Sequence, residues 1–173
     1  MERTRTGIVA GARAGIVRDG VRRLSMATVA ELGGIAKATV YNHVRSKPQL
    51  LAMVAHDLLD RVERAAAAPL TLLESLVVAA DTAATDDVVR AVAEREPAVL
   101  GRLLRMHGSP VWDDARGRVG TLLERHGAAS DDAAVDVVLR WLVSWTVSPA
   151  DDTRIRQTVS LVLGGLPRPG TGS

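Results

Sequence analysis

Side chains that can hydrogen-bond are concentrated between Lys37 and His43, where Lys37, Thr39, Tyr41, Asn42 and His43 occupy five of seven positions. An asparagine amide can pair with the edge of a base, and hydroxyl, ammonium and imidazole groups can reach phosphate oxygens. This mixture is typical of a segment that contacts nucleic acid. Its arrangement on a helix decides whether the groups can act together.

Two short helices joined by a glycine turn are predicted around this segment. Ser25 is a favoured N-cap before an apolar-periodic run, and Gly33-Gly34 provides a turn in which positive φ costs little. A second helix then begins after Ile35 and continues through Val44. It is about 15 Å long at 1.5 Å per residue, which suits a major groove.

The second helix is predicted to have a small, polar outer face. Val40 and Val44 point inward together, because residues four apart share one side of a helix. The outer face and its two flanks then carry Ala38, Asn42, Lys37, Tyr41, Thr39 and His43. Short outer side chains allow the close approach that a groove-reading helix needs.

A first helix is predicted before Ser25, and it contains Gly7, Gly11 and Gly15. Each glycine costs roughly 0.5 to 1 kcal/mol relative to alanine in a helix interior. We therefore expect this helix to be weak without DNA or a partner.

A more specific motif lies in the same residues: Ser25, Gly34-Ile35, Lys37, Thr39-Val40-Tyr41-Asn42-His43 and Ser46-Lys47. In these residues the chain resembles the tetracycline-repressor (TetR) family of bacterial transcription regulators. The resemblance covers roughly residues 8 to 55. The sequence departs from the family pattern at Ala36, Ala38 and Val44, where serine, glycine and phenylalanine are usual.

The resemblance implies roles for individual residues. Lys37, Ala38 and Tyr41 would face bases, and Asn42 joins them from its place on the helical wheel. Phosphate contacts would come from Ser25, Thr39, Tyr41, His43 and Lys47. The residues that hold the head together would be Val29, Leu32, Ile35, Val40 and Val44.

Charge is distributed unevenly along the chain, whose net charge is +2. Residues 1–50 contain nine basic and three acidic residues, so the remaining residues are net acidic. A basic head on an acidic body is the footprint of a DNA-binding protein with a separate second domain. A solvated basic surface without a partner is the alternative, and charge alone does not decide between them.

The rest of the chain predicts an all-α fold, because apolar residues recur at spacings of three and four and strand-like alternation is absent. The expected organisation is a helix-turn-helix head over residues 1–47, a helical ligand-binding and dimerisation body over 48–165, and a disordered tail over 166–173. A long helix that begins near Pro48 would join head to body.

The helix that begins near Asp131 is apolar on more than one face, so it must be buried on both sides. The resemblance implies a homodimer formed through the last two long helices. The predicted interface comprises Val138, Trp141, Trp145, Ile155, Val159 and Val162. The alternative is that Trp141 and Trp145 fill the core of a single chain.

A small-molecule pocket in the body is implied by the resemblance alone. Its candidate residues are Arg105, Met106, His107, Trp112 and Trp141, which suit a small apolar or amphiphilic effector.

Enzymatic chemistry has little support in the sequence. The chain has no cysteine and no G-x-S-x-G, H-E-x-x-H or phosphate-binding glycine motif, and its paired aspartates stand where they would cap helices. His56 and Asp60 are the only potential metal ligands four residues apart on their helix. We therefore expect no catalytic residues, no cofactor and no metal.

The N-terminal residues lack the continuous apolar stretch of a signal peptide, and no later uncharged run approaches about 18 residues. We expect a cytoplasmic protein without a membrane partner.

These features together predict a homodimeric transcriptional regulator that binds a palindromic double-stranded DNA operator, most often a repressor released by a small molecule. The alternative is a helical adaptor of the same fold that no longer binds DNA or ligand. Ala36 and Ala38 favour the adaptor, because they remove polar atoms from the recognition helix, whereas Lys37, Tyr41 and His43 favour the regulator.

Overall fold

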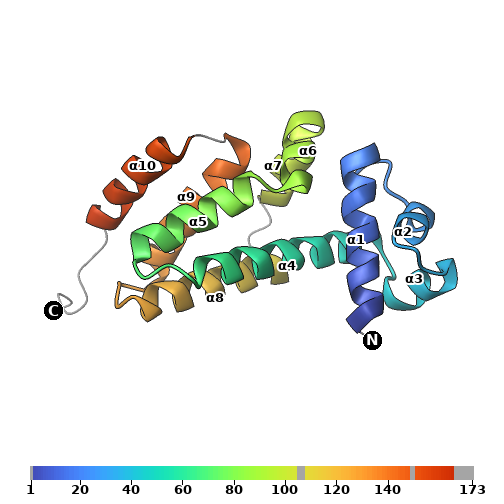
Figure 1. The fold of residues 1–173 in the computed structure, drawn as a ribbon, viewed down its shortest axis with the longest axis horizontal. Helices are drawn as coiled ribbons and strands as arrows, with labels where there is room; N and C mark the ends of the chain where they lie inside the picture. The colour runs from blue at the N-terminus through green and yellow to red at the C-terminus, as the bar shows by residue number, and fades with distance from the viewer. Residues whose placement is uncertain (1, 105–107, 149–150, 166–173) are drawn as a thin grey trace. The chain divides into compact units, whose positions relative to one another are not determined.

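The computed structural model describes residues 2–104, 108–148 and 151–165, and within these ranges the chain is helical and has no β-strand (Figure 1). The described helices are α1 (Glu2–Asp19), α2 (Met26–Leu32), α3 (Lys37–His43), α4 (Lys47–Ala66), α5 (Leu72–Ala84), α6 (Asp87–Arg95), α7 (Pro97–Leu104), α8 (Pro110–Arg125), α9 (Asp132–Val147) and α10 (Asp152–Gly165). The predicted all-α class is confirmed. The predicted tail, 166–173, lies outside the described residues.

The helices form two compact units. The head unit contains Met1–Leu58 and Asp86–Leu103, and the body unit contains Leu59–Thr85 and Leu104–Ser173. Helix α4 begins at Lys47, one residue before the predicted start of the body, and its residues 47–58 belong to the head unit. The sequence assigns residues 86–103 to the body, whereas the structure groups them with the head. None of the helices in the described ranges has the length and apolarity needed to cross a membrane.

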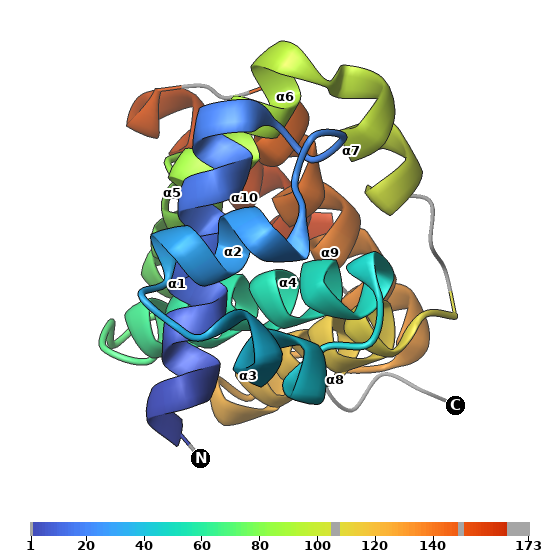
Figure 2. The ribbon, with the colours of Figure 1, turned by 90° about the vertical axis from the view of Figure 1, so that its right-hand side faces the viewer.

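The predicted helix-turn-helix is present in the head unit as α2 and α3 (Figure 2). Ser25 caps α2 by accepting a hydrogen bond from the Thr28 backbone N–H at 3.1 Å. The turn passes through Gly34 at φ +61°, a conformation that glycine adopts without strain. Helix α3 ends at His43, one residue before the predicted end, because Val44 is extended and fully buried.

The glycines of α1 have a packing role that the sequence does not reveal. A Cβ on Gly11 would overlap the Val29 carbonyl oxygen and lie 2.7 Å from the Gly33 backbone nitrogen. A Cβ on Gly33 would in turn lie 2.5 Å from the Gly7 carbonyl oxygen. The backbone of α1 therefore lies directly against the C-terminal end of α2. The expectation that these glycines merely weaken α1 is incomplete, because they also permit this close approach.

Helix α6 is attached to α1 at both of its ends. At its N-terminus, Asp86 accepts hydrogen bonds from the Val88 and Val89 backbone N–H groups at 3.0 Å and from Arg13 Nη2 at 2.9 Å. Arg13 also pairs with Asp87, and its Nη1 lies 3.6 Å from Asp57 Oδ2 on α4. Asp86 thus caps a helix, as predicted, and also forms an ion pair with Arg13.

The other end of α6 contacts the last turn of α1 and the residues after it. Glu96 accepts hydrogen bonds from the backbone N–H groups of Val21 at 2.5 Å and Arg22 at 3.1 Å. Arg95 Nη1 donates to the Val17 carbonyl oxygen at 2.5 Å. These bonds involve backbone groups at the end of α1 and in the residues that follow it, so they do not depend on the side chains that this segment carries.

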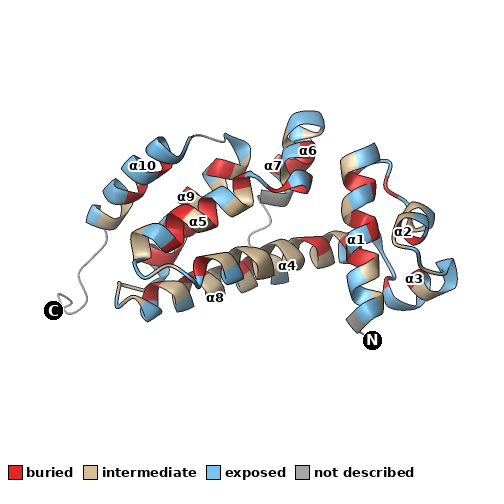
Figure 3. Cartoon of the chain, in the orientation of Figure 1, coloured by how far each residue is buried: buried red, intermediate tan, exposed pale blue. Residues whose placement is uncertain are grey.

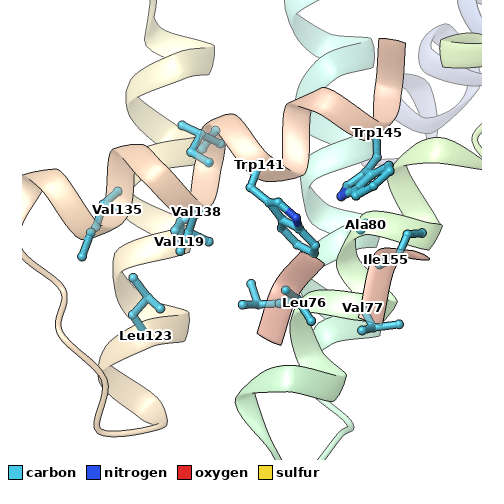
Figure 4. Packing of buried hydrophobic residues seen from close by; sticks show 14 of the residues in the cluster. Leu76, Val77, Ala80, Val119, Leu123, Val135, Val138, Trp141, Trp145 and Ile155 are labelled. Atoms are coloured by element: carbon cyan, nitrogen blue, oxygen red, sulfur yellow. The ribbon is translucent and has the colours of Figure 1, made fainter. Parts of the chain in front are cut away.

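The body unit has one apolar core, to which α5, α8, α9 and α10 contribute (Figure 4). The Trp141 and Trp145 rings meet edge to face, with centroids 5.9 Å apart and an interplanar angle of 83°. Trp141 Nε1 donates to Thr158 Oγ1 on α10 at 3.2 Å. Helix α9 is apolar on several faces because it packs against α5 and α8 and its tryptophan bonds to α10.

The residues predicted to form the dimer interface therefore lie within this core. The buried ones are Val138, Trp141, Trp145, Ile155 and Val159, and Val162 packs against them half-buried. Their side chains pack inside one chain, which is what the alternative interpretation of the tryptophans predicts. The exposed residues of α9 lie on its opposite face.

Candidate nucleic-acid interface

The outer face of α3 is exposed along the whole helix (Figure 3). Its exposed side chains are Lys37, Ala38, Tyr41, Asn42 and His43, and Thr39 is half-buried. Val40 is fully buried on the inner face, so the predicted division of this helix into two faces is present. Tyr41 is 53% exposed, which is unusual for so large an aromatic side chain in a folded domain.

Two contacts within α3 organise this face in the absence of a partner. The Lys37 ammonium lies 6.0 Å from the centroid of the Tyr41 ring, within the range of a cation–π interaction. The His43 Nδ1 atom lies 2.9 Å from the Thr39 carbonyl oxygen, one turn earlier on the same helix. The first contact places a cation beside an exposed ring, and the second fixes the orientation of the imidazole.

The predicted phosphate contacts outside α3 have partners within the chain. Ser25 Oγ lies 2.9 Å from Thr28 Oγ1 in addition to capping α2. Lys47 Nζ donates to the Arg22 carbonyl oxygen at 2.9 Å. Lys47 keeps two further N–H donors, because an ammonium group has three. Its position next to the connection between α1 and α2 is therefore compatible with a second, external acceptor.

The connection between α3 and α4 is held by Gln49, which the sequence interpretation did not single out. Ser46 Oγ accepts from the Gln49 backbone N–H at 3.3 Å, and Gln49 Oε1 accepts from the Arg45 backbone N–H at 2.8 Å. The Gln49 side chain also donates to the His43 carbonyl oxygen at 3.5 Å. The signal was present in the sequence, because serine followed three residues later by glutamine is a capping-box pattern.

The nine basic residues among positions 1–50 divide into two groups. Arg13, Arg18 and Arg22 form ion pairs with carboxylates of the head unit. The hydrogen bond from Arg18 lowers the pKa of Asp19, so this pair stays ionised near neutral pH. Within the described ranges the others form no ion pair; they are Arg3, Arg5, Arg23, Lys37, Arg45 and Lys47. Arg23 is nevertheless near enough to Asp19 to contribute to the lowered pKa of that carboxyl. Four of the six, Arg3, Arg5, Arg23 and Arg45, were not assigned a role from the sequence.

Two of the five predicted ligand-binding residues, Trp112 and Trp141, lie within the described ranges. Trp112 and Trp141 both belong to the apolar core of the body unit and are 9% exposed. Arg105, Met106 and His107 lie outside the described residues.

Comparison with known proteins gives a structural likeness without a sequence match. No protein-family model matches the chain, and no curated protein matches it. Among solved structures, the TetR-family repressor AlkX from a Dietzia species, implicated in the biodegradation of n-alkanes, is 16% identical. Its TM-score is 0.68, with 92% of this chain and 93% of that chain covered.

Two other solved structures give the same result. The multidrug binding protein EbrR, complexed with imidazole, is 21% identical with a TM-score of 0.67, over 96% of this chain and 92% of that one. A TetR-family transcriptional regulator from Haemophilus influenzae is 15% identical with a TM-score of 0.56, over 94% of this chain and 96% of that one. The likeness extends over both units and includes the helix-turn-helix whose face is described above. The chain therefore has the fold of TetR-family transcriptional regulators.

Proposed function

We propose that the protein is a homodimeric transcriptional regulator that reads operator DNA with α3. The observation that carries this proposal is the outer face of α3, where Lys37, Tyr41, Asn42 and His43 are exposed and the Lys37 ammonium lies over the Tyr41 ring. An exposed helix of this composition has the groups that base edges and phosphates require. A bacterial regulator of this kind would bind the chromosome in the cytoplasm, which is the location expected from the sequence.

A binding selection from random duplexes tests this proposal. We expect a palindromic site, with half-sites about 34 to 36 Å apart or at a longer spacing of the same kind, because a two-fold dimer presents two identical helices. A single asymmetric half-site would contradict the dimer. Failure to enrich any sequence would favour the adaptor, in which the fold is kept and DNA binding is lost.

Replacing Tyr41 or Lys47 with alanine should change DNA binding in different ways. Lys47→Ala should weaken binding to all sequences alike and lower the salt slope by about one unit, because a phosphate contact is removed. Tyr41→Ala should also reduce discrimination, by about 1 to 3 kcal/mol, because an exposed ring loses its contact with a base. Fluorescence anisotropy on operator and random duplexes over a salt series measures both quantities. Equal losses on both duplexes for Tyr41→Ala would refute its base contact.

We propose that the second chain packs on the outward face of α9. This face carries Ala133, Val137, Arg140, Ser144 and Val147, all of them exposed. Val137 and Val147 are 47% and 58% exposed, so apolar surface is left uncovered by the single chain. On the neighbouring α8, a Cβ added at Gly117 meets nothing within 4 Å, so another backbone could approach closely there. The pair Arg116–Asp136, at 3.0 Å, joins the two helices beneath this surface.

The adjacent residues Val137 and Val138 provide a matched test of this surface. Val137→Arg should give a helical monomer that binds operator weakly, because a charge is placed at the interface and the avidity of two heads is lost. Val138→Arg should instead unfold the body unit, because Val138 is fully buried in its core. Sedimentation and circular dichroism separate the two results. If the Val137→Arg variant were still a folded dimer, the interface would have to lie on another surface.

We propose that a small apolar or amphiphilic effector binds in the body unit and releases DNA. AlkX is described as a repressor and EbrR as a multidrug binding protein, which supports this kind of regulation here. Trp145 adds an observation from this chain, because its buried Nε1–H has no hydrogen-bond acceptor in the described part of the structure. An effector with one acceptor atom would satisfy this donor.

A compound screen read by tryptophan fluorescence and operator release tests the effector. A tenfold loss of operator affinity requires about 1.4 kcal/mol of coupling between the two sites. Trp145→Phe should weaken effector binding while operator binding without effector stays unchanged. Release of DNA by a compound equally well from the Trp145→Phe variant would exclude the indole from the site.

A further inference from the structure

A hydrogen bond within α3 fixes which nitrogen of the His43 imidazole carries the hydrogen when the ring is neutral. The Nδ1 atom lies 2.9 Å from the Thr39 carbonyl oxygen, and a carbonyl oxygen can only accept a hydrogen bond. Nδ1 must therefore carry the hydrogen. In an uncharged ring the second nitrogen, Nε2, then has a lone pair and no hydrogen. His43 is exposed, so Nε2 is the atom that a partner on this face would meet.

A phosphate oxygen is an acceptor as well, so an uncharged His43 in this orientation has nothing to donate to it. Turning the hydrogen to Nε2 in the neutral ring would break the bond to Thr39, because Nδ1 and the carbonyl oxygen would then both be acceptors. The doubly protonated ring donates from both nitrogens and keeps both bonds.

We propose that His43 contacts the DNA backbone as an imidazolium, so that operator binding takes up a proton at each head. The proposal rests on the DNA-binding function proposed above. It assigns to this histidine a role that a phosphate-binding lysine does not have, namely a contact whose strength depends on pH.

The segments around His43 come from several helices of the head unit. Helix α3 packs against α1 and α2, and α4 follows it through the Gln49 amide. The charged residues on α3, on its connection to α4 and at the start of α4 are Lys37, Arg45 and Lys47, and those of α1 and α2 include Arg3, Arg5 and Glu31. The phosphates of bound DNA would add negative charge beside His43, which favours the charged ring in the complex.

The sign of the effect follows from linkage. A state that binds an extra proton is favoured at low pH, so operator affinity should fall as pH rises across the range in which histidine side chains lose their charge. The limiting dependence is about tenfold in affinity for each pH unit and each head.

The test is the affinity of the full-length protein for a fluorescent operator duplex between pH 6 and 8 at constant ionic strength. For the natural protein we expect weaker binding at the higher pH. His43→Gln should bind with an affinity that barely changes with pH and matches the natural protein near pH 8. His43→Lys, which is charged throughout, should bind tightly at every pH in this range. Calorimetry in buffers of different ionisation enthalpy should show proton uptake by the natural protein alone.

His56 supplies a matched control. Its Nδ1 lies 2.7 Å from the Ala52 carbonyl oxygen, the same one-turn contact, on α4 and away from the α3 face. His56→Gln should therefore keep the pH dependence of the natural protein. Circular dichroism checks that each variant is folded.

Two outcomes overturn the proposal while the proposed function stands: operator affinity independent of pH in the natural protein, or an unchanged pH dependence in His43→Gln. Failure of the natural protein to bind any duplex at any of these pH values would overturn the proposed function as well.

Discussion

Gly11→Ala should destabilise the head unit by about 1 to 3 kcal/mol or more, although alanine favours helices over glycine. The added Cβ would overlap the Val29 carbonyl oxygen and lie 2.7 Å from the Gly33 nitrogen and 2.9 Å from Gly33 Cα. All three are backbone atoms of α2 and its cap, so no side-chain rotation can relieve the overlap. Urea unfolding and operator affinity should both show the loss.

Gly101→Ala is the matched control for this substitution. Gly101 lies in α7 of the same unit, and a Cβ there would meet nothing within 4 Å. The same change should therefore stabilise the protein slightly, by about 0.5 to 1 kcal/mol, through helix propensity alone. Effects of equal sign at the two positions would show that α1 does not depend on backbone contact with α2.

Asp86→Ala should be the other strongly destabilising change, at about 3 to 5 kcal/mol. The Asp86 side chain is 1% exposed, and its removal leaves the 17%-exposed Arg13 without its most buried partner. It also removes the N-cap of α6, a smaller loss of about 1 kcal/mol.

Asp86→Asn separates these two contributions, because asparagine is also a good N-cap but carries no charge. We expect its free energy of unfolding to lie between those of the natural protein and Asp86→Ala. If Asp86→Asn were as stable as the natural protein, the ion pair with Arg13 would contribute little, and capping would account for the whole effect.

The parts of the fold that the sequence predicted correctly depend on short-range signals. The Ser25 cap, the Gly33-Gly34 turn and the inward pair Val40 and Val44 each span only a few neighbouring residues, so each pattern can be recognised in the sequence. The same is true of the outer face of α3, whose residues the helical wheel orders correctly.

The parts that the sequence did not predict depend on contacts between distant segments. A Cβ at Gly11 would overlap α2 only because α2 packs back against α1. Arg13 and Asp86, which form an ion pair, are more than 70 residues apart in the sequence. The apolar faces of α9 indicated burial but could not say whether α5, α8 and α10 or a second chain covered them. Within the site, the bond from His43 to Thr39 is local, but it depends on a side-chain orientation that no spacing rule gives.

The attachment of α6 to α1 has a consequence for protein engineering. The head unit, which contains the proposed DNA-reading helix, is encoded in two separate stretches, because Asp86 and Glu96 bind Arg13 and the backbone N–H groups of Val21 and Arg22. A chimera that transplants only the N-terminal stretch would leave a buried cation and two backbone donors facing a foreign helix. Moving the helix-turn-helix between proteins of this fold therefore calls for moving residues 86–96 with it, and a change of the proposed DNA specificity is better made in α3 alone, with both stretches left in place.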